Sequence, residues 1–166
     1  MKYGTRFECS NFSFSPICVD DAGMLFKVVS SHNFPKLLPL AKIQTLEQAE
    51  SWCKNRASEW KSEDCFVWSC REISSSQIVG QVTILPKAEY LALAYWVDPD
   101  VWGQGVATEM CSSLLTHLKI MGYRGKVWAG VHSWNKRSSA VLEKLGFAKV
   151  DASKKDTFEY MFEISR

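Results

Sequence analysis

The stretch from Val97 to Thr108 holds the residues whose types and spacing could do chemistry. Gly103, Gly105 and Ala107 have little or no side chain, so the backbone there can approach a ligand closely. A predicted helix follows, and the N–H groups of its first turn have no partner inside the helix. These groups and the helix dipole favour a bound phosphate or pyrophosphate. We predict an anion-binding loop, although the same glycines are also typical of a tight turn.

Two other phosphate-binding motifs do not match this loop. A P-loop needs four residues between its glycines and then Lys-Ser/Thr, and the sequence has neither. A dinucleotide fingerprint needs a third glycine or alanine where Thr108 stands, and an acid about twenty residues later, where the chain reads Tyr123-Arg124-Gly125-Lys126. Nucleotide hydrolysis and a Rossmann dehydrogenase are therefore disfavoured.

The hydrophobic pattern predicts the elements that position the loop. A strand over residues 91–97 precedes it, a helix over 104–121 follows it, and a strand over 126–132 comes next. Strand, helix and strand form a βαβ unit, which pairs its strands in parallel and leaves the helix N-terminus at the carboxyl end of the first strand. Ligands bind in such crevices. A helix over 136–145 and strands over 147–150 and 158–164 complete the chain.

The N-terminal half is predicted to be a strand, two helices and an antiparallel meander. Residues 12–15 alternate as a strand does, and Asp20 or Asp21 can cap a helix that ends near Val29. Thr45 to Gln48 has the form of a capping box for a helix ending near Lys61. The strands of the meander are 66–70, 78–84 and 91–97. The apolar loop from His32 to Leu40 is either a packed connection or a wall of the acceptor pocket.

Composition excludes several classes of protein. The 166 residues are 46% hydrophobic and 23% charged, which predicts one globular domain over residues 1–166. Twenty basic and eighteen acidic residues lack the basic stripe of nucleic-acid binders. The chain has no signal-type or membrane-spanning apolar run, so we expect a cytoplasmic location without membrane partners. Six cysteines and three histidines show no ligand spacing, so we expect reduced thiols and no metal.

Two motifs resemble one family. Residues 94–109, AYWVDPDVWGQGVATE, are similar to the acetyl-CoA loop of the GNAT superfamily in its RimJ/RimL-type form, that of ribosomal-protein N-terminal acetyltransferases. Asn135 and Ser138, followed by Glu143-Lys144-Leu145-Gly146-Phe147, resemble the Asn-x-x-Ser and Glu-Lys-x-Gly-Phe signature of that subfamily. The resemblance extends from about residue 12 to the C-terminus. It implies an α/β GNAT fold, with a mixed, twisted sheet of six to seven strands, about four helices and acetyl-CoA held where strands 4 and 5 separate.

The resemblance also implies a cofactor site. The pantetheine arm would pair with the backbone near Trp96 and Val97, while N–H groups from Gly103 through Thr108 would hold the pyrophosphate. Asn135 would face the cofactor arm as well as cap the helix over 136–145. The expected acetyl-CoA-binding residues are Trp96, Val97, Gly103, Gln104, Gly105, Val106, Ala107, Thr108, Asn135 and Ser138.

The expected chemistry departs from the wider family at two positions. Many GNAT enzymes protonate the leaving sulfur with a tyrosine where this chain has Leu142, so the resemblance assigns that hydrogen bond to Ser138, whose alternative is an ordinary hydroxyl in a first helical turn. A glutamate that acts as base in the subfamily is replaced by Ala92. Glu89 and His132 are the nearest substitutes, with Glu89 taken as the catalytic candidate.

These features predict an acetyl-CoA-dependent N-acetyltransferase that acts by direct attack of an amine on the thioester. A weak base suits a protein or peptide N-terminal α-amine, whose pKa of about 7.7 lies well below the 10.4 or so of lysine. The alternatives are a small-molecule acceptor, such as a polyamine, amino acid or antibiotic, and a catalytically inactive CoA-binding module. Exposed sheet edges can pair between two copies of a chain, so the protein is either a monomer or a homodimer.

Overall fold

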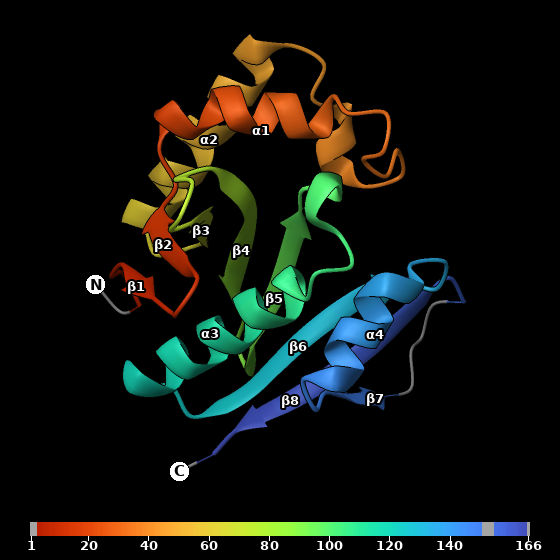
Figure 1. The fold of residues 1–166 in the computed structure, drawn as a ribbon. Helices are drawn as coiled ribbons and strands as arrows, with labels where there is room; N and C mark the ends of the chain where they lie inside the picture. Colours follow the sequence, from red (N-terminus) through yellow and green to blue (C-terminus); the bar gives the residue numbers. More distant parts are fainter. Residues whose placement is uncertain (1–2, 151–154, 166) are drawn as a thin grey trace.

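One mixed sheet organises the chain in the computed structural model, which describes residues 3–150 and 155–165. Its strand order is β1-β2-β3-β4-β5-β6-β8-β7. Helices α1 and α2 pack together, and α3 and α4 lie across β4 to β8 (Figure 1). The strands are β1 (Phe7–Glu8), β2 (Phe12–Pro16), β3 (Phe66–Glu72), β4 (Ile78–Pro86), β5 (Tyr90–Val97), β6 (Gly125–His132), β7 (Ala148–Val150) and β8 (Thr157–Ile164). The α-helices of the described residues are α1 (Ala22–Val29), α2 (Leu46–Lys61), α3 (Val106–Ile120) and α4 (Lys136–Lys144).

The sheet opens between β5 and β6. β4 pairs with β5 along Gly80–Pro86, whereas the parallel pair of β5 and β6 is limited to Tyr90–Ala92 against Lys126–Trp128. The parallel βαβ unit predicted from the sequence is confirmed. The sheet has eight strands instead of six to seven, because the two-residue β1 pairs with β2 and escaped the pattern analysis. The opening therefore lies between the fifth and sixth strands in this count.

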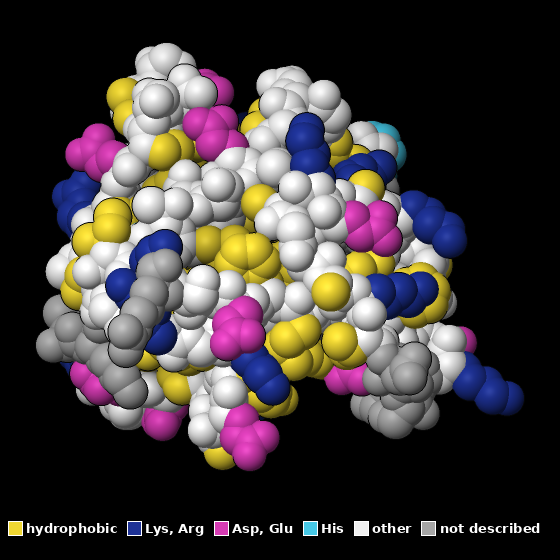
Figure 2. Space-filling model, turned by 90° about the horizontal axis from the view of Figure 1, so that it is seen from below, with side chains coloured by type: hydrophobic (Ala, Val, Ile, Leu, Met, Phe, Trp, Pro, Cys, Tyr) yellow, Lys and Arg dark blue, Asp and Glu magenta, His cyan; other side chains and the backbone are white. Residues whose placement is uncertain are grey.

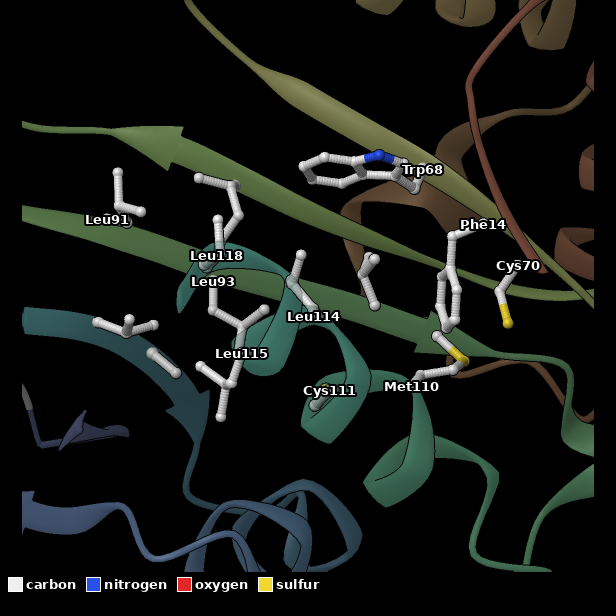
Figure 3. Packing of buried hydrophobic residues seen from close by; sticks show 14 of the residues in the cluster. Phe14, Trp68, Cys70, Leu91, Leu93, Met110, Cys111, Leu114, Leu115 and Leu118 are labelled. Atoms are coloured by element: carbon white, nitrogen blue, oxygen red, sulfur yellow. The ribbon is translucent and has the colours of Figure 1, made fainter. Parts of the chain in front are cut away.

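Two groups of buried side chains cover the two faces of the sheet. On one face, α3 packs its apolar stripe of Met110, Cys111, Leu114 and Leu118 against strand residues such as Phe14 and Trp68 (Figure 3). On the other face, α1 and α2 pack against β3 and β4. Successive side chains of β3 point to opposite faces of the sheet, so Trp68 belongs to the first group and Val67 to the second. Both faces of the central strands are thus fixed in place by burial.

The helix starts follow local chemistry, with two differences from the prediction. Helix α3 begins at Val106 instead of Gln104, because Gly103 and Gly105 have φ angles of +81° and +76°, outside the helical region. Asp21 precedes α1 but its side chain does not cap the helix. The Thr45 cap is confirmed, since its Oγ1 accepts a hydrogen bond of 3.1 Å from the N–H of Gln48. Each remaining predicted element is found within a few residues of its expected ends.

The surface shows no concentrated charge on the face seen from below. Lysine, arginine and acidic side chains alternate there with apolar atoms (Figure 2). Such a mixture agrees with the formal charge of +2. Among the described helices, none has both the length and the apolar character that crossing a bilayer requires.

His117 predicts a pH dependence of stability. Its ring is buried against Phe7, with ring centroids 4.2 Å apart, and its Nε2 donates a hydrogen bond of 3.1 Å to the carbonyl of Tyr3, which can only accept. Burial lowers the pKa of His117 below its usual 6.5, although this hydrogen bond opposes the shift. The unfolded chain therefore takes up a proton at a pH where the folded chain does not. Stability is expected to fall as the pH drops below about 6.5.

Urea unfolding at pH 7.5 and 5.5 measures this effect. The wild type should lose stability between the two values, and His117→Gln should lose less. His132→Gln is the matched control, because His132 is exposed and should keep the wild-type slope. Equal losses in the wild type and His117→Gln would contradict the assignment.

Candidate active site

A cavity of about 660 Å³ occupies the opening between β5 and β6. Its walls come from the loop before α2, from α2 itself, from the carboxyl half of β5, from the start of α3, from β6 and from α4. The cavity is continuous, so a long ligand can reach from the N-terminus of α3 to the loop before α2. Its volume is in the range of small-molecule and cofactor sites.

The N-terminus of α3 forms one end of this cavity. Gly105 occupies the N-cap position and has no side chain to accept from the first-turn N–H groups. A Cβ added at Gly103 or Gly105 would meet no atom within 4 Å, so both backbones face open space. These residues, together with Val106, Ala107 and Thr108, line the cavity. Unpaired N–H groups and a helix dipole directed at open space fit a bound pyrophosphate.

A basic side chain, Arg137, flanks the same end. The guanidinium carbon of Arg137 lies 3.6 Å from the centroid of the Trp102 ring, a cation–π contact. The Trp102 indole N–H donates a hydrogen bond of 3.1 Å to the carbonyl of Val97, which fixes the position of the ring relative to the end of β5. Arg137 and Lys144 both line the cavity from α4. Arg137 places positive charge beside the glycine-containing loop, where an anionic ligand would lie.

A pair of hydroxyls lies in the cavity wall between its two ends. Asn135 caps α4, and its Oδ1 accepts from the N–H of Ser138 at 3.2 Å, which fixes the start of the helix. The Ser138 Oγ accepts a hydrogen bond of 3.1 Å from the Tyr95 hydroxyl. Because Tyr95 donates, the Ser138 proton is free to be donated into the cavity. Both side chains line it.

Tyr95 is the functional candidate that sequence reasoning missed. Burial raises the pKa of its phenol well above the usual 10.0, and the hydrogen bond with Ser138 partly offsets that rise. The phenol therefore stays protonated and keeps its role as donor. The tyrosine expected from the wider family would stand at the position of Leu142, on α4, whereas Tyr95 comes from β5. Tyr95 lies in the predicted strand that borders the opening of the sheet, and this position could have identified it from the sequence.

The structure gathers most of the predicted site residues and leaves out two. Nine of the ten predicted acetyl-CoA-binding residues line the cavity, and Gln104, which is exposed, is not among the lining residues. Glu89 is exposed, lies immediately before β5 and is also absent from the lining. His132, the second candidate base, lines the cavity from the end of β6. Ala92 is buried in the three-residue pairing with β6 and carries no acid.

The tryptophan Trp96 is held by a buried chain of hydrogen bonds. Its indole N–H donates to Gln81 Oε1 at 2.9 Å, and Gln81 Nε2 donates to Ser69 Oγ at 3.0 Å. The Ser69 hydroxyl donates to Asp21 Oδ2 at 2.8 Å, and Arg71 pairs with the other oxygen of Asp21 at 2.8 Å. An ionised carboxylate only accepts, so the donor direction is fixed along the whole chain. The ring of Trp96 is thereby oriented in the cavity wall.

The described residues contain no cluster of side chains that could bind a metal ion. Within residues 3–150 and 155–165, no group of three His, Cys, Asp or Glu side chains is placed to hold a metal ion. The six cysteines are free thiols, of which Cys53, Cys65, Cys70 and Cys111 are buried.

Comparison with known proteins agrees with this geometry. Residues 11–148 match the profile of a family described as an acetyltransferase (GNAT) domain. The chain belongs to the GNAT acetyltransferases. The resemblance to this family is therefore confirmed, and RimL and RimJ enzymes are among the solved structures with a similar fold.

Several relatives give the similarity in numbers. An uncharacterized N-acetyltransferase of Bacillus subtilis (strain 168), YoaA, is 23% identical over 133 residues, covering 78% of this chain and 75% of its own. The structure of RimL, a ribosomal L7/L12 alpha-N-protein acetyltransferase in complex with coenzyme A, aligns with a TM-score of 0.85 at 14% identity, covering 96% of this chain and 98% of RimL. A ribosomal-protein-S5-alanine acetyltransferase from Vibrio fischeri aligns at 0.75 with 17% identity and 96% coverage of each chain. At these identities the solved structures establish the fold.

Proposed function

We propose that this GNAT enzyme transfers the acetyl group of acetyl-CoA to the α-amine at the N-terminus of a protein or peptide. The observation that carries the proposal is the continuous cavity at the opening of the sheet, with an anion-binding helix end at one side and the Tyr95–Ser138 pair in its wall. Structural neighbours named as acetyltransferases of ribosomal proteins support an acceptor of this kind.

The helix end would hold the pyrophosphate of acetyl-CoA through the N–H groups of Gly103, Gly105, Val106, Ala107 and Thr108, with Arg137 adding positive charge. Beyond Ala92, β5 diverges from β6, which leaves the Trp96 and Val97 segment facing the opening. The pantetheine amides would pair with that segment, and Asn135 would line the same path. These residues orient the donor and exclude water from it.

The acetyl thioester supplies an activated acyl group to the site. The neutral amine forms a bond to the acyl carbon, the C–S bond breaks, and its electron pair leaves on sulfur. We assign Ser138 as the donor of a hydrogen bond to the leaving thiolate, with Tyr95 donating to the Ser138 oxygen in turn. The proton lost by the amine passes to solvent at the mouth of the cavity. Glu89 has no part in this scheme, because it is exposed outside the lining.

The acceptor preference is tested with one peptide that carries both a free α-amine and an internal lysine. At pH 7 the deprotonated fraction of the α-amine, with a pKa of about 7.7, is about 400-fold larger than that of the lysine, with a pKa of about 10.4. Mass mapping of the product should place acetyl on the α-amine. A version with a blocked N-terminus should react at least about a hundredfold more slowly. Acetylation of lysine at a comparable rate in both peptides would contradict the α-amine assignment, and turnover of small amines alone would support the small-molecule alternative.

The pH dependence should follow the acceptor rather than an enzyme base. Among the described lining residues there is no carboxylate, and the single imidazole, that of His132, is exposed and stacks on Trp134 with ring centroids 5.4 Å apart. We expect kcat/KM for a peptide to rise with pH and to level off near the α-amine pKa of about 7.7.

The variant His132→Asn checks this point. It should change kcat/KM by less than about threefold and leave the inflection in place, since the reaction would not use the imidazole as base. Peptides with different α-amine pKa values should move the inflection accordingly. A large loss in His132→Asn that higher pH restores would instead identify His132 as the base.

A further inference from the structure

The part of the cavity lined by the loop before α2 and by α2 is apolar and aromatic. It is formed by Phe34, Leu38 and Leu40 from the loop before α2, by Trp52 from α2 and by Trp96 from β5. We call these five residues the acceptor end. Trp52 is half-buried and lines the cavity. The apolar loop from His32 to Leu40 is thus a wall of the cavity and not only a packed connection.

The charged side chains that line the cavity all have one sign and come from a single helix. The charged side chains among the described lining residues are Arg137 and Lys144, both basic and both on α4. No described lining residue carries a carboxylate. A polyamine or an aminoglycoside would bring further ammonium groups into this space without an acidic partner, and an unpaired charge moved from water into an apolar site is strongly disfavoured.

The aromatic wall of the acceptor end is rigid. Trp96 is fixed through Gln81, Ser69 and Asp21, and its ring meets that of Phe34 edge to face, with centroids 6.4 Å apart and an interplanar angle of 77°. Both rings are buried. A preorganised aromatic surface gains contact area from an apolar ligand group without first having to be ordered.

We propose that the acceptor amine carries a bulky, uncharged apolar group next to its nitrogen, and that the acceptor end receives this group. For a peptide substrate this group is the side chain of the first residue, such as leucine or phenylalanine. The inference rests on the proposed function, since it takes the Tyr95–Ser138 pair as the place of acetyl transfer. It goes further by naming the specificity-determining residues Leu38, Trp52 and Trp96.

The direct test is a set of peptides that differ only in their first residue, namely leucine, phenylalanine, serine, aspartate and lysine, with spermidine added as a polyamine. The leucine and phenylalanine peptides should show a kcat/KM at least about tenfold above that of the serine peptide, because pocket discrimination of this size is typical for apolar groups. The lysine and aspartate peptides and spermidine should be the poorest acceptors. Serine, lysine or spermidine as the best acceptor would overturn the inference while leaving acetyl transfer intact. Failure of every amine to react, with acetyl-CoA bound in a calorimetric titration, would overturn the proposed function as well.

A charge placed in the acceptor end should reverse the preference. Leu38→Asp introduces a carboxylate into the lining, so the ratio of kcat/KM for the lysine peptide to that for the leucine peptide should rise about tenfold or more. Leu37→Asp is the matched control, because Leu37 is the adjacent residue, is 72% exposed and lies outside the lining. It should leave the ratio unchanged. An equal change in both variants would contradict the assignment of Leu38, and if Leu38→Asp fails to fold, the wild-type peptide series alone decides the question.

Discussion

Replacing Gly105 with glutamate is expected to weaken acetyl-CoA binding by at least about a hundredfold, because like charges brought together at an interface cost several kcal/mol. The position is the N-cap of α3, and a side chain there would extend into open space inside the cavity. A carboxylate at this point would lie where we place the pyrophosphate. Its charge would also occupy the favourable end of the helix dipole in place of the ligand. Calorimetric titration with acetyl-CoA measures the change.

The matched control for this variant is Gly122→Glu. Gly122 also has a positive φ, +96°, and a Cβ added there also meets no atom within 4 Å. It lies after the C-terminal end of α3 and outside the cavity lining, so the change adds the same charge and a similar backbone strain away from the site. Gly122→Glu should bind acetyl-CoA as the wild type does. Equal binding by folded Gly105→Glu and the wild type would exclude this helix end as the pyrophosphate site.

Ser138→Ala is expected to lower kcat about 10- to 100-fold, the size of a lost hydrogen bond to a charged group. The KM for acetyl-CoA should change little, because the cap of α4 uses the backbone N–H of Ser138 and survives the substitution. The loss should therefore appear in the chemical step, where charge develops on sulfur. Steady-state kinetics at saturating acetyl-CoA give the comparison.

The neighbouring Ser139 supplies the control for Ser138. Its hydroxyl is buried and has no hydrogen-bond partner among the described residues, and it does not line the cavity. Ser139→Ala should keep the wild-type kcat. Tyr95→Phe should lose less activity than Ser138→Ala, and the double variant should be no slower than Ser138→Ala alone, because the tyrosine acts through the serine. Additive losses would show that the two hydroxyls act separately.

Local patterns predicted the elements and the glycine-containing loop for clear reasons. Each predicted strand and helix has an apolar period that burial enforces, and α3 shows this best with Met110, Leu114 and Leu118 on one face. The loop was predicted from Gly103 and Gly105, whose positive φ angles also explain why α3 starts later than expected. Backbone requirements of this kind leave a direct trace in the residue types.

Features that depend on distant parts of the chain were missed. Asp20 or Asp21 was expected to cap α1, but the Asp21 carboxylate binds Ser69 and Arg71, which are 48 and 50 residues away. The Tyr95–Ser138 contact spans 43 residues and arises because the opening of the sheet brings β5 beside α4. Glu89 was chosen because it is close in sequence to the strand that lines the site. It lies one residue before β5 and is not among the residues that line the cavity. No local pattern records such contacts.

The most direct measurement of acetyl transfer from acetyl-CoA to an amine in this cavity is the release of free CoA thiol by the wild-type protein with a leucine-first peptide. We predict that release depends on both substrates and matches, mole for mole, the acetylated peptide found by mass spectrometry. Firm binding of acetyl-CoA with no peptide-dependent release, for this peptide and for a broad panel of other amines, would contradict it and leave a CoA-binding module.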